Sequence, residues 1–140
     1  MENKIVFYSD GGSRGNPGEA ALGVYFPVLE KEFSEYLNIA TNNEAEYKAI
    51  IYGLKKAKRF AGEDHKKTAV EIRADSELAV RQLNGEYKMK DEKLIPLFIE
   101  IWNLKTEFKN VLFVHIPREE NVRADTMVNR ELDSRQKGMF

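Results

Sequence analysis

Four acidic side chains stand near the ends of predicted strands or the starts of predicted helices: Asp10, Glu46, Asp75 and Asp125. Asp10 follows the apolar stretch KIVFYS (4–9), and Asp75 follows the alternating stretch TAVEIRA (68–74). If these two strands are parallel neighbours, both carboxylates project at the same sheet edge, where open α/β sheets bind ligands. Four acids gathered there would repel one another unless a cation held them. Their all-oxygen ligand set favours Mg²⁺ or Mn²⁺ over zinc.

Each acid also has an ordinary structural role as an alternative. Asp75, before Ser76, is typical of a helix cap. Glu46 is typical of a solvated helix position, and Asp125 of an acid that the helix dipole favours near an N-terminus. Asp10 is less easily explained in this way, because it ends an apolar strand and begins a glycine-rich segment. The metal-site hypothesis therefore depends on the four acids together.

The glycine-rich segment YSDGGSRGNPGEA (8–20) raises the alternative of a phosphate-binding loop. Neither the P-loop pattern nor the Rossmann pattern occurs in it. Phosphatases with an aspartate nucleophile usually place a second Asp two residues on, where this chain has Gly12. A standard nucleotide cradle is therefore excluded, and a glycine-rich turn between two strands remains.

The hydrophobic periodicity predicts the elements that would position these acids. Five strands are expected at residues 4–9, 20–28, 32–39, 68–74 and 110–116. Four helices are expected at residues 41–60, from the Asp75-Ser76 cap to 83, 91–108 and 121–133, with a frayed tail at 134–140. Thr41 and Glu44 form a capping box for the first helix. The order βββαβααβα implies an α/β fold whose mixed sheet has an antiparallel hairpin on one side and parallel crossovers on the other.

The composition fits one globular domain over residues 1–140. The 22 basic and 23 acidic residues give a net charge of −1, which argues against coating nucleic acid by bulk charge but not against a nucleic-acid enzyme. The absence of cysteine excludes thiol catalysis and cysteine-based zinc sites. No apolar run approaches the roughly 20 residues of a membrane span, and no signal peptide is present, so a cytoplasmic location is expected.

The motifs resemble those of type 1 ribonuclease H, over about residues 4–133. The matching segments are YSDGG with GNPG (8–18), TNNEAE (41–46), ADS (74–76), and HIPREEN with AD (115–125). The resemblance implies a ribonuclease H-like fold and hydrolysis of the RNA strand of RNA–DNA hybrids, leaving 5′-phosphate and 3′-hydroxyl ends. The alternatives are a non-catalytic nucleic-acid-binding module on the same fold, against which the intact acid quartet argues, and a small-molecule α/β protein, against which the initial run of three strands argues.

The resemblance also implies roles for individual residues. Asp10, Glu46, Asp75 and Asp125 would hold two divalent ions, one activating the attacking water and the other stabilising the leaving 3′-oxygen. RNA sugars and phosphates would be contacted by the segment Gly11, Gly12, Ser13, Arg14, Gly15 and Asn16. Asn42 would reach the minor groove, whereas Thr41 and Asn43 would lie near the DNA strand.

The chain also departs from the family pattern. The segment 84–93 (NGEYKMKDEK) is short and lacks the tryptophans of the basic protrusion found in many members, and the HIPREEN spelling is closer to an archaeal-like subgroup. Many bacterial relatives place a mobile histidine near the final aspartate. Here His115 falls on a predicted strand, so Arg118 is the expected auxiliary catalytic residue. The expected partner is an RNA–DNA hybrid, bound by a monomer without membrane association.

Overall fold

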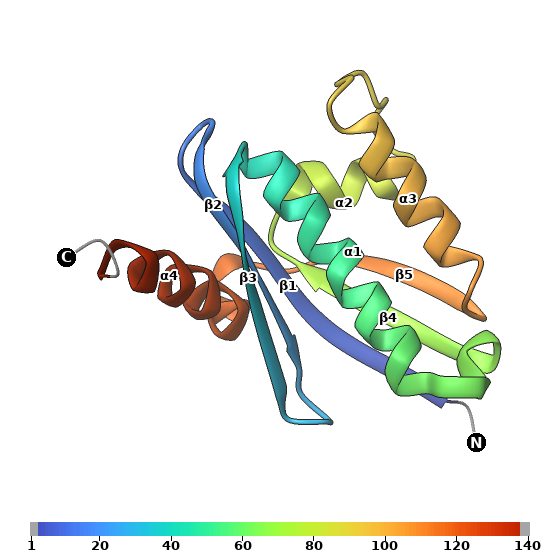
Figure 1. The fold of residues 1–140 in the computed structure, drawn as a ribbon. Helices are drawn as coiled ribbons and strands as arrows, with labels where there is room; N and C mark the ends of the chain where they lie inside the picture. The colour runs from blue at the N-terminus through green and yellow to red at the C-terminus, as the bar shows by residue number, and fades with distance from the viewer. Residues whose placement is uncertain (1–2, 138–140) are drawn as a thin grey trace.

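A five-stranded mixed sheet forms the centre of the protein (Figure 1). The computed structural model describes residues 3–137, with side chains described through residue 135. The strands are β1 (Asn3–Gly15), β2 (Gly18–Phe26), β3 (Lys31–Ala40), β4 (Thr68–Ala74) and β5 (Asn110–His115), and they lie in the order β3-β2-β1-β4-β5. The β1–β2 and β2–β3 pairs are antiparallel, whereas β1–β4 and β4–β5 are parallel. The predicted mixed sheet, with an antiparallel hairpin on one side and parallel crossovers on the other, is therefore confirmed.

Helices cover both faces of this sheet. They are α1 (Asn42–Ala61), α2 (Glu77–Leu83), α3 (Ile95–Lys105) and α4 (Val122–Lys137), with short 3₁₀ helices η1 (Gly62–Lys67) and η2 (Arg118–Glu120). Successive side chains of β2 point to opposite faces. Leu22 belongs to the main core with α1, whereas Ala21 packs against Val128 and Leu132 of α4. Helices α1 and α4 therefore sandwich the sheet, and Figure 1 shows α4 beside β2 and β3, apart from the other helices.

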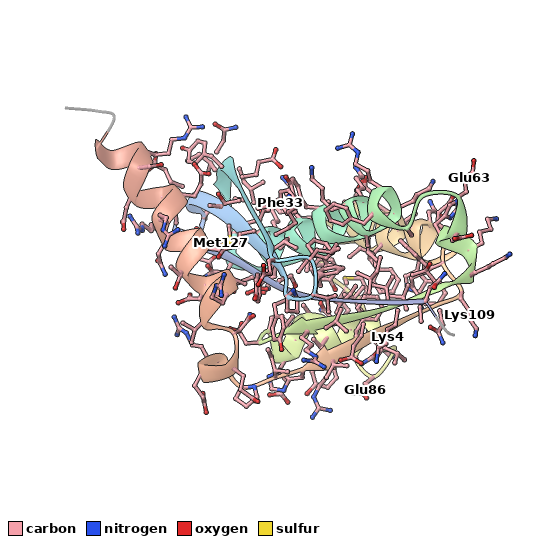
Figure 2. The ribbon with its side chains drawn as sticks, turned by 90° about the horizontal axis from the view of Figure 1, so that it is seen from below. Lys4, Phe33, Glu63, Glu86, Lys109 and Met127 are labelled. Carbon is pink, nitrogen blue, oxygen red and sulfur yellow. The ribbon has the colours of Figure 1, made fainter. Side chains whose placement is uncertain are left out.

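The main core lies between the sheet and helices α1 to α3. Phe7 of β1, Tyr47 and Leu54 of α1, and Ile72 of β4 are fully or almost fully buried within it. Figure 2 shows this layer of side chains from below, with the charged residues Glu63 and Lys109 at the outside. Among the residues that the structure describes, no helix has both the length and the apolar character needed to cross a membrane.

The largest departure from the predicted elements is the length of β1. The sequence predicts a strand that ends at Ser9 and a glycine-rich loop after it, but β1 runs on to Gly15. Residues 10–15 pair with β2 in regular antiparallel register as far as Gly15 and Gly18. A tight turn with a cis Asn16–Pro17 bond joins the two strands. Asp10 consequently lies inside a strand and not at its end.

Two helices also differ from their predicted bounds. Helix α3 spans Ile95–Lys105, so it is shorter than predicted at both ends; residues 91–94 form a turn in which the Asp91 carboxylate accepts the Lys93 N–H. Helix α4 continues to Lys137, so residues 134–137 of the expected frayed tail are helical, and residues 138–140 lie outside the described part of the chain. Ser134 donates a hydrogen bond to the Glu131 carbonyl, and the Arg135 guanidinium lies over the Tyr36 ring, which stabilises the added turn.

Candidate active site

Asp10 and Asp75 come together because β4 stops while β1 continues. The last parallel pair joins Ser9 to Ala74, and each aspartate is the next residue along its chain. Asp75 then precedes Ser76, whose hydroxyl caps α2 by accepting the Ala79 N–H. The cap belongs to Ser76, so the Asp75 carboxylate remains directed to the site that it shares with Asp10.

Glu46 reaches this site because α1 packs directly on the backbone of β1. The helix starts at the predicted capping box, in which Thr41 Oγ1 accepts the Glu44 N–H and the Glu44 carboxylate accepts the Thr41 N–H. A β-carbon on Gly11 would lie 2.4 Å from the Glu46 nitrogen. Only glycine permits that approach. This close packing of α1 on β1 brings one carboxylate oxygen from each of Asp10, Glu46 and Asp75 within 4.8 Å of the other two.

Asp125 approaches the other acids from α4, on the opposite face of the sheet from α1. A β-carbon on Gly23 of β2 would lie 2.4 Å from the carbonyl oxygen of Ala124, so α4 also packs closely on the sheet. Asp125 lines the same cavity as the other three acids, but it is not a member of the group within 4.8 Å. The structure thus gathers three of the predicted ligands tightly and places the fourth at the cavity wall.

Burial dominates the electrostatics of these acids. It raises the pKa of Asp10 to about 7, and the neighbouring Asp75 carboxylate adds to the rise. Burial, with the charge of Asp10, likewise raises the pKa of Glu46 well above its ordinary value. The pKa of Asp75 is raised mainly by burial, against which the Asn121 hydrogen bond and the Arg118 charge act. The raised pKa values mean that the three carboxyl groups do not readily ionise at the same time. A bound cation would stabilise all three in the ionised form.

Glu46 supplies a direct test of whether a cation fits here. Its Oε2 atom is buried and has no hydrogen-bond partner in the described part of the chain. Buried polar oxygens are rarely left unpaired. A hard divalent cation among the three carboxylates would satisfy this oxygen and their charge at once. The residues present therefore fit such an ion.

Asn121 is a site residue that the sequence reasoning missed as a functional position. Its side chain is almost fully buried, and the side-chain Nδ2 atom donates hydrogen bonds to the Ser9 carbonyl at 2.9 Å and to the Asp75 Oδ2 atom at 3.4 Å. It therefore ties the start of α4 to β1 and orients one of the acids. The available signal was its place in HIPREEN, four residues before Asp125 and next to the start of the last helix.

The predicted substrate-contact residues gather on one side of the acids, around the β1–β2 hairpin and the start of α1. The Asn42 carboxamide oxygen accepts the Ser13 N–H at 2.8 Å, and the Asn42 N–H donates to the Asn16 side chain at 3.1 Å. A cavity of about 500 Å³ opens here. Its lining includes Gly11, Gly12, Ser13, Arg14, Asn42 and Asn43. The lining does not include Gly15, Asn16 or Thr41, although the Asn16 side chain accepts a hydrogen bond from the Asn42 N–H at the start of α1.

The two candidates for the auxiliary catalytic residue occupy different places. Arg118, at the start of η2, lines the cavity with the acids. His115, the last residue of β5, is exposed and is not part of the lining. Arg118 is therefore the one of the two that lines the cavity, although the charge of His115 also acts to lower the pKa of Asp75.

Known proteins match this chain in both sequence and fold. Residues 30–131 match a family model described as reverse transcriptase-like. The solved structure of LC11-RNase H1, isolated from compost by a metagenomic approach, was determined in complex with an RNA/DNA hybrid. It matches with a TM-score of 0.88 and 44% identity, over 94% of this chain and 99% of that one. The chain belongs to the type 1 ribonuclease H family.

Some of the relatives are longer than the present chain. The ribonuclease HI of Halobacterium salinarum is 38% identical over 93% of this chain and 65% of its own length. The bifunctional protein Rv2228c of Mycobacterium tuberculosis is 33% identical over 94% of this chain. The chain spans only 36% of that protein's length.

Proposed function

We propose that this chain is an endonuclease that hydrolyses the RNA strand of RNA–DNA hybrids and leaves 5′-phosphate and 3′-hydroxyl ends. The observation that carries the proposal is the group of three carboxylates within 4.8 Å of one another on the wall of a cavity of about 500 Å³. The similarity to LC11-RNase H1, which was solved with a hybrid bound, supports the choice of substrate.

Asp10, Glu46, Asp75 and Asp125 are the proposed ligands of two divalent cations, Mg²⁺ or Mn²⁺. When bound, such ions would activate the attacking water and stabilise the leaving 3′-oxygen. Asp10 has the central place, because Glu46, Asp75 and Asp125 all influence its pKa. Asn121 holds Asp75 in position, and Arg118 supplies a positive charge at the same cavity. We assign Arg118 the auxiliary role in catalysis or product release.

The cavity wall offers contacts suited to sugars, phosphates and groove edges. Asn42 uses its carboxamide oxygen to hold Ser13, which leaves its Nδ2 donor for an acceptor in the minor groove. Gly11 and Gly12 bring the backbone itself to the cavity. Such contacts distinguish RNA from DNA through the 2′-hydroxyl and carry little sequence information. The proposed substrate is therefore defined by its strand type and not by its sequence.

We further propose that residues 1–140 act as one ribonuclease H domain, as a cytoplasmic monomer. A second candidate function is binding of hybrids without cleavage. The acids argue against it, because a binding module gains nothing from burying mutually repelling carboxylates beside an anionic ligand.

One assay separates these functions. The purified chain is incubated with end-labelled RNA–DNA hybrid, duplex RNA and duplex DNA, each with Mg²⁺, with Mn²⁺ and with EDTA. Internal cleavage of the RNA strand of the hybrid, dependent on the metal, is expected. Binding of the hybrid without cleavage under every metal condition would instead establish the non-catalytic module.

A further inference from the structure

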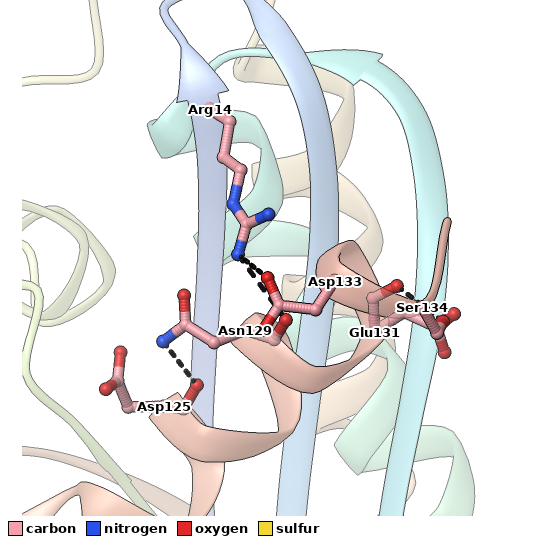
Figure 3. A network of polar contacts seen from close by, with 6 residues as sticks. All are labelled: Arg14, Asp125, Asn129, Glu131, Asp133 and Ser134. Atoms are coloured by element: carbon pink, nitrogen blue, oxygen red, sulfur yellow. Dashed lines mark hydrogen bonds and ion pairs between the residues drawn. The ribbon is translucent and has the colours of Figure 1, made fainter. Parts of the chain in front are cut away.

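Arg14 of β1 forms an ion pair with Asp133 of α4. A single guanidinium nitrogen, Nη2, lies 2.6 Å from the Asp133 Oδ1 atom and 3.5 Å from the Asn129 carbonyl oxygen (Figure 3). The same helix carries Asp125 in its first turn, and the Asp125 carbonyl accepts the Asn129 side-chain amide at 3.1 Å. The pair therefore joins the hairpin of β1 to the helix that contributes the fourth acid.

Arg14 belongs to the same face of β1 as Asp10. Side chains alternate along a strand, so Asp10, Gly12 and Arg14 share one face. The face is the one that α4 crosses, because a β-carbon on Gly12 would contact Val128 at 3.3 Å. Four residues of strand place Arg14 roughly 13 Å from Asp10. Both line one cavity, so a nucleic-acid strand lying in it would present different phosphates to the acids and to Arg14.

Asp133 lies near the C-terminal end of α4, where an acidic side chain does not stabilise the helix. It is four residues from the end of α4 at Lys137, and the C-terminal end of a helix disfavours negative charge. Its side chain is 56% exposed and that of Arg14 is 33% exposed, so the pair is weak and readily exchanged. Of the guanidinium donors, only Nη2 is engaged within the described part of the chain, whereas a phosphate can take two donors in parallel.

We propose that Arg14 forms a phosphate subsite for the hybrid and that the Asp133 carboxylate occupies its guanidinium as an internal substitute until a phosphate replaces it. This inference rests on the proposed function, because it takes the hybrid as the ligand. Asp133 then lowers affinity for the substrate. Its effect is specific to one partner, Arg14, and is not a general effect of its charge.

The test is a double-mutant cycle in hybrid binding, measured by fluorescence anisotropy in EDTA at several salt concentrations. Arg14→Ala is expected to weaken binding about tenfold and to reduce the slope of log affinity against log salt by about one. Asp133→Asn is expected to tighten binding about two- to threefold. In the Arg14→Ala background, Asp133→Asn is expected to add nothing beyond a general charge effect.

Glu131→Gln is the matched control for that general effect. It removes the same charge from the same helix, and Glu131 contacts Ser34 and Arg135 but not Arg14. Weaker binding by Asp133→Asn, equal tightening in both Arg14 backgrounds, or unchanged affinity and salt slope in Arg14→Ala would each overturn the proposal. Failure of the wild-type chain to cleave hybrid would contradict the proposed function alone, because the binding cycle does not depend on cleavage.

Discussion

A β-carbon placed on Gly11 would lie 2.2 Å from the carbonyl carbon of Ala45. The neighbours of these two residues are Asp10 and Glu46, so the contact between the backbones of β1 and α1 sets the separation of two candidate metal ligands. Gly11 is therefore required by the geometry of the site and not by a turn, since it lies within a regular strand.

Gly11→Ala is expected to destabilise the fold and reduce cleavage together. A methyl group there meets backbone, which cannot move aside, so a cost at or above the usual overpacking range of about 1–3 kcal/mol is expected. Gly12→Ala is the control for stability, because its β-carbon would meet only the Val128 side chain at 3.3 Å. Urea unfolding of both variants gives the comparison. Equal free energies of unfolding for Gly11→Ala and Gly12→Ala would show that the packing of α1 on β1 does not require glycine at position 11.

The folded metal-free protein should lose stability as pH rises. Burial raises the pKa of Asp10 from 3.8 to about 7, so between these values the folded state binds protons that the unfolded chain releases. The contribution is fully present below pH 3.8 and is lost as pH rises through about 7, with a slope of at most about 1.4 kcal/mol per pH unit for one group. Unfolding free energies measured in EDTA across this range check it.

The Asp10→Asn variant isolates this effect from other titrating groups. Its free energy of unfolding should depend less on pH than that of the wild type, and millimolar Mg²⁺ should stabilise the wild type more at pH 8 than at pH 5. Parallel pH profiles for the two proteins would contradict a raised Asp10 pKa.

Asn121→Ala is expected to lower cleavage about 10- to 100-fold and to raise the Mg²⁺ concentration needed for half-maximal activity. The physical reason is the loss of the amide that orients Asp75 at 3.4 Å. Asn84→Ala is a matched control, because Asn84 also donates a side-chain hydrogen bond to a strand carbonyl, that of Phe113, outside the active-site cavity. Both variants should lose stability, and only Asn121→Ala should change the metal dependence. If the Asn121→Ala and Asn84→Ala variants needed the same Mg²⁺ concentration for half-maximal activity, the role of Asn121 would be purely structural.

Much of the fold was predictable because local signals agreed with it. The capping box at Thr41, the Ser76 cap and the alternation of 68–74 all correspond to elements in the structure. The pairing of Asp10 with Asp75 followed from one assumption, that their strands are parallel neighbours, and the register confirms that assumption.

The rest could not be predicted, because it depends on contacts between distant segments. Glycine has a low propensity for β-strands, so the local sequence does not predict that β1 continues to Gly15. The continuation depends on pairing with β2 and on the packing of α1 and α4 against the two faces of β1. Asn121 gains its role from Ser9, which is 112 residues away in sequence. The Arg14–Asp133 pair spans 119 residues and had no local signal.

Cleavage of a labelled hybrid by Asp10→Asn in Mg²⁺ tests whether the buried acids hold the catalytic cations. Circular dichroism and unfolding measurements first establish that the variant is folded, which is expected because the substitution removes a buried charge. We expect the rate of cleavage to fall by more than about a thousandfold, which corresponds to about 4 kcal/mol in the activation barrier. Near-normal cleavage by the folded variant would contradict the assignment of these carboxylates as the catalytic centre.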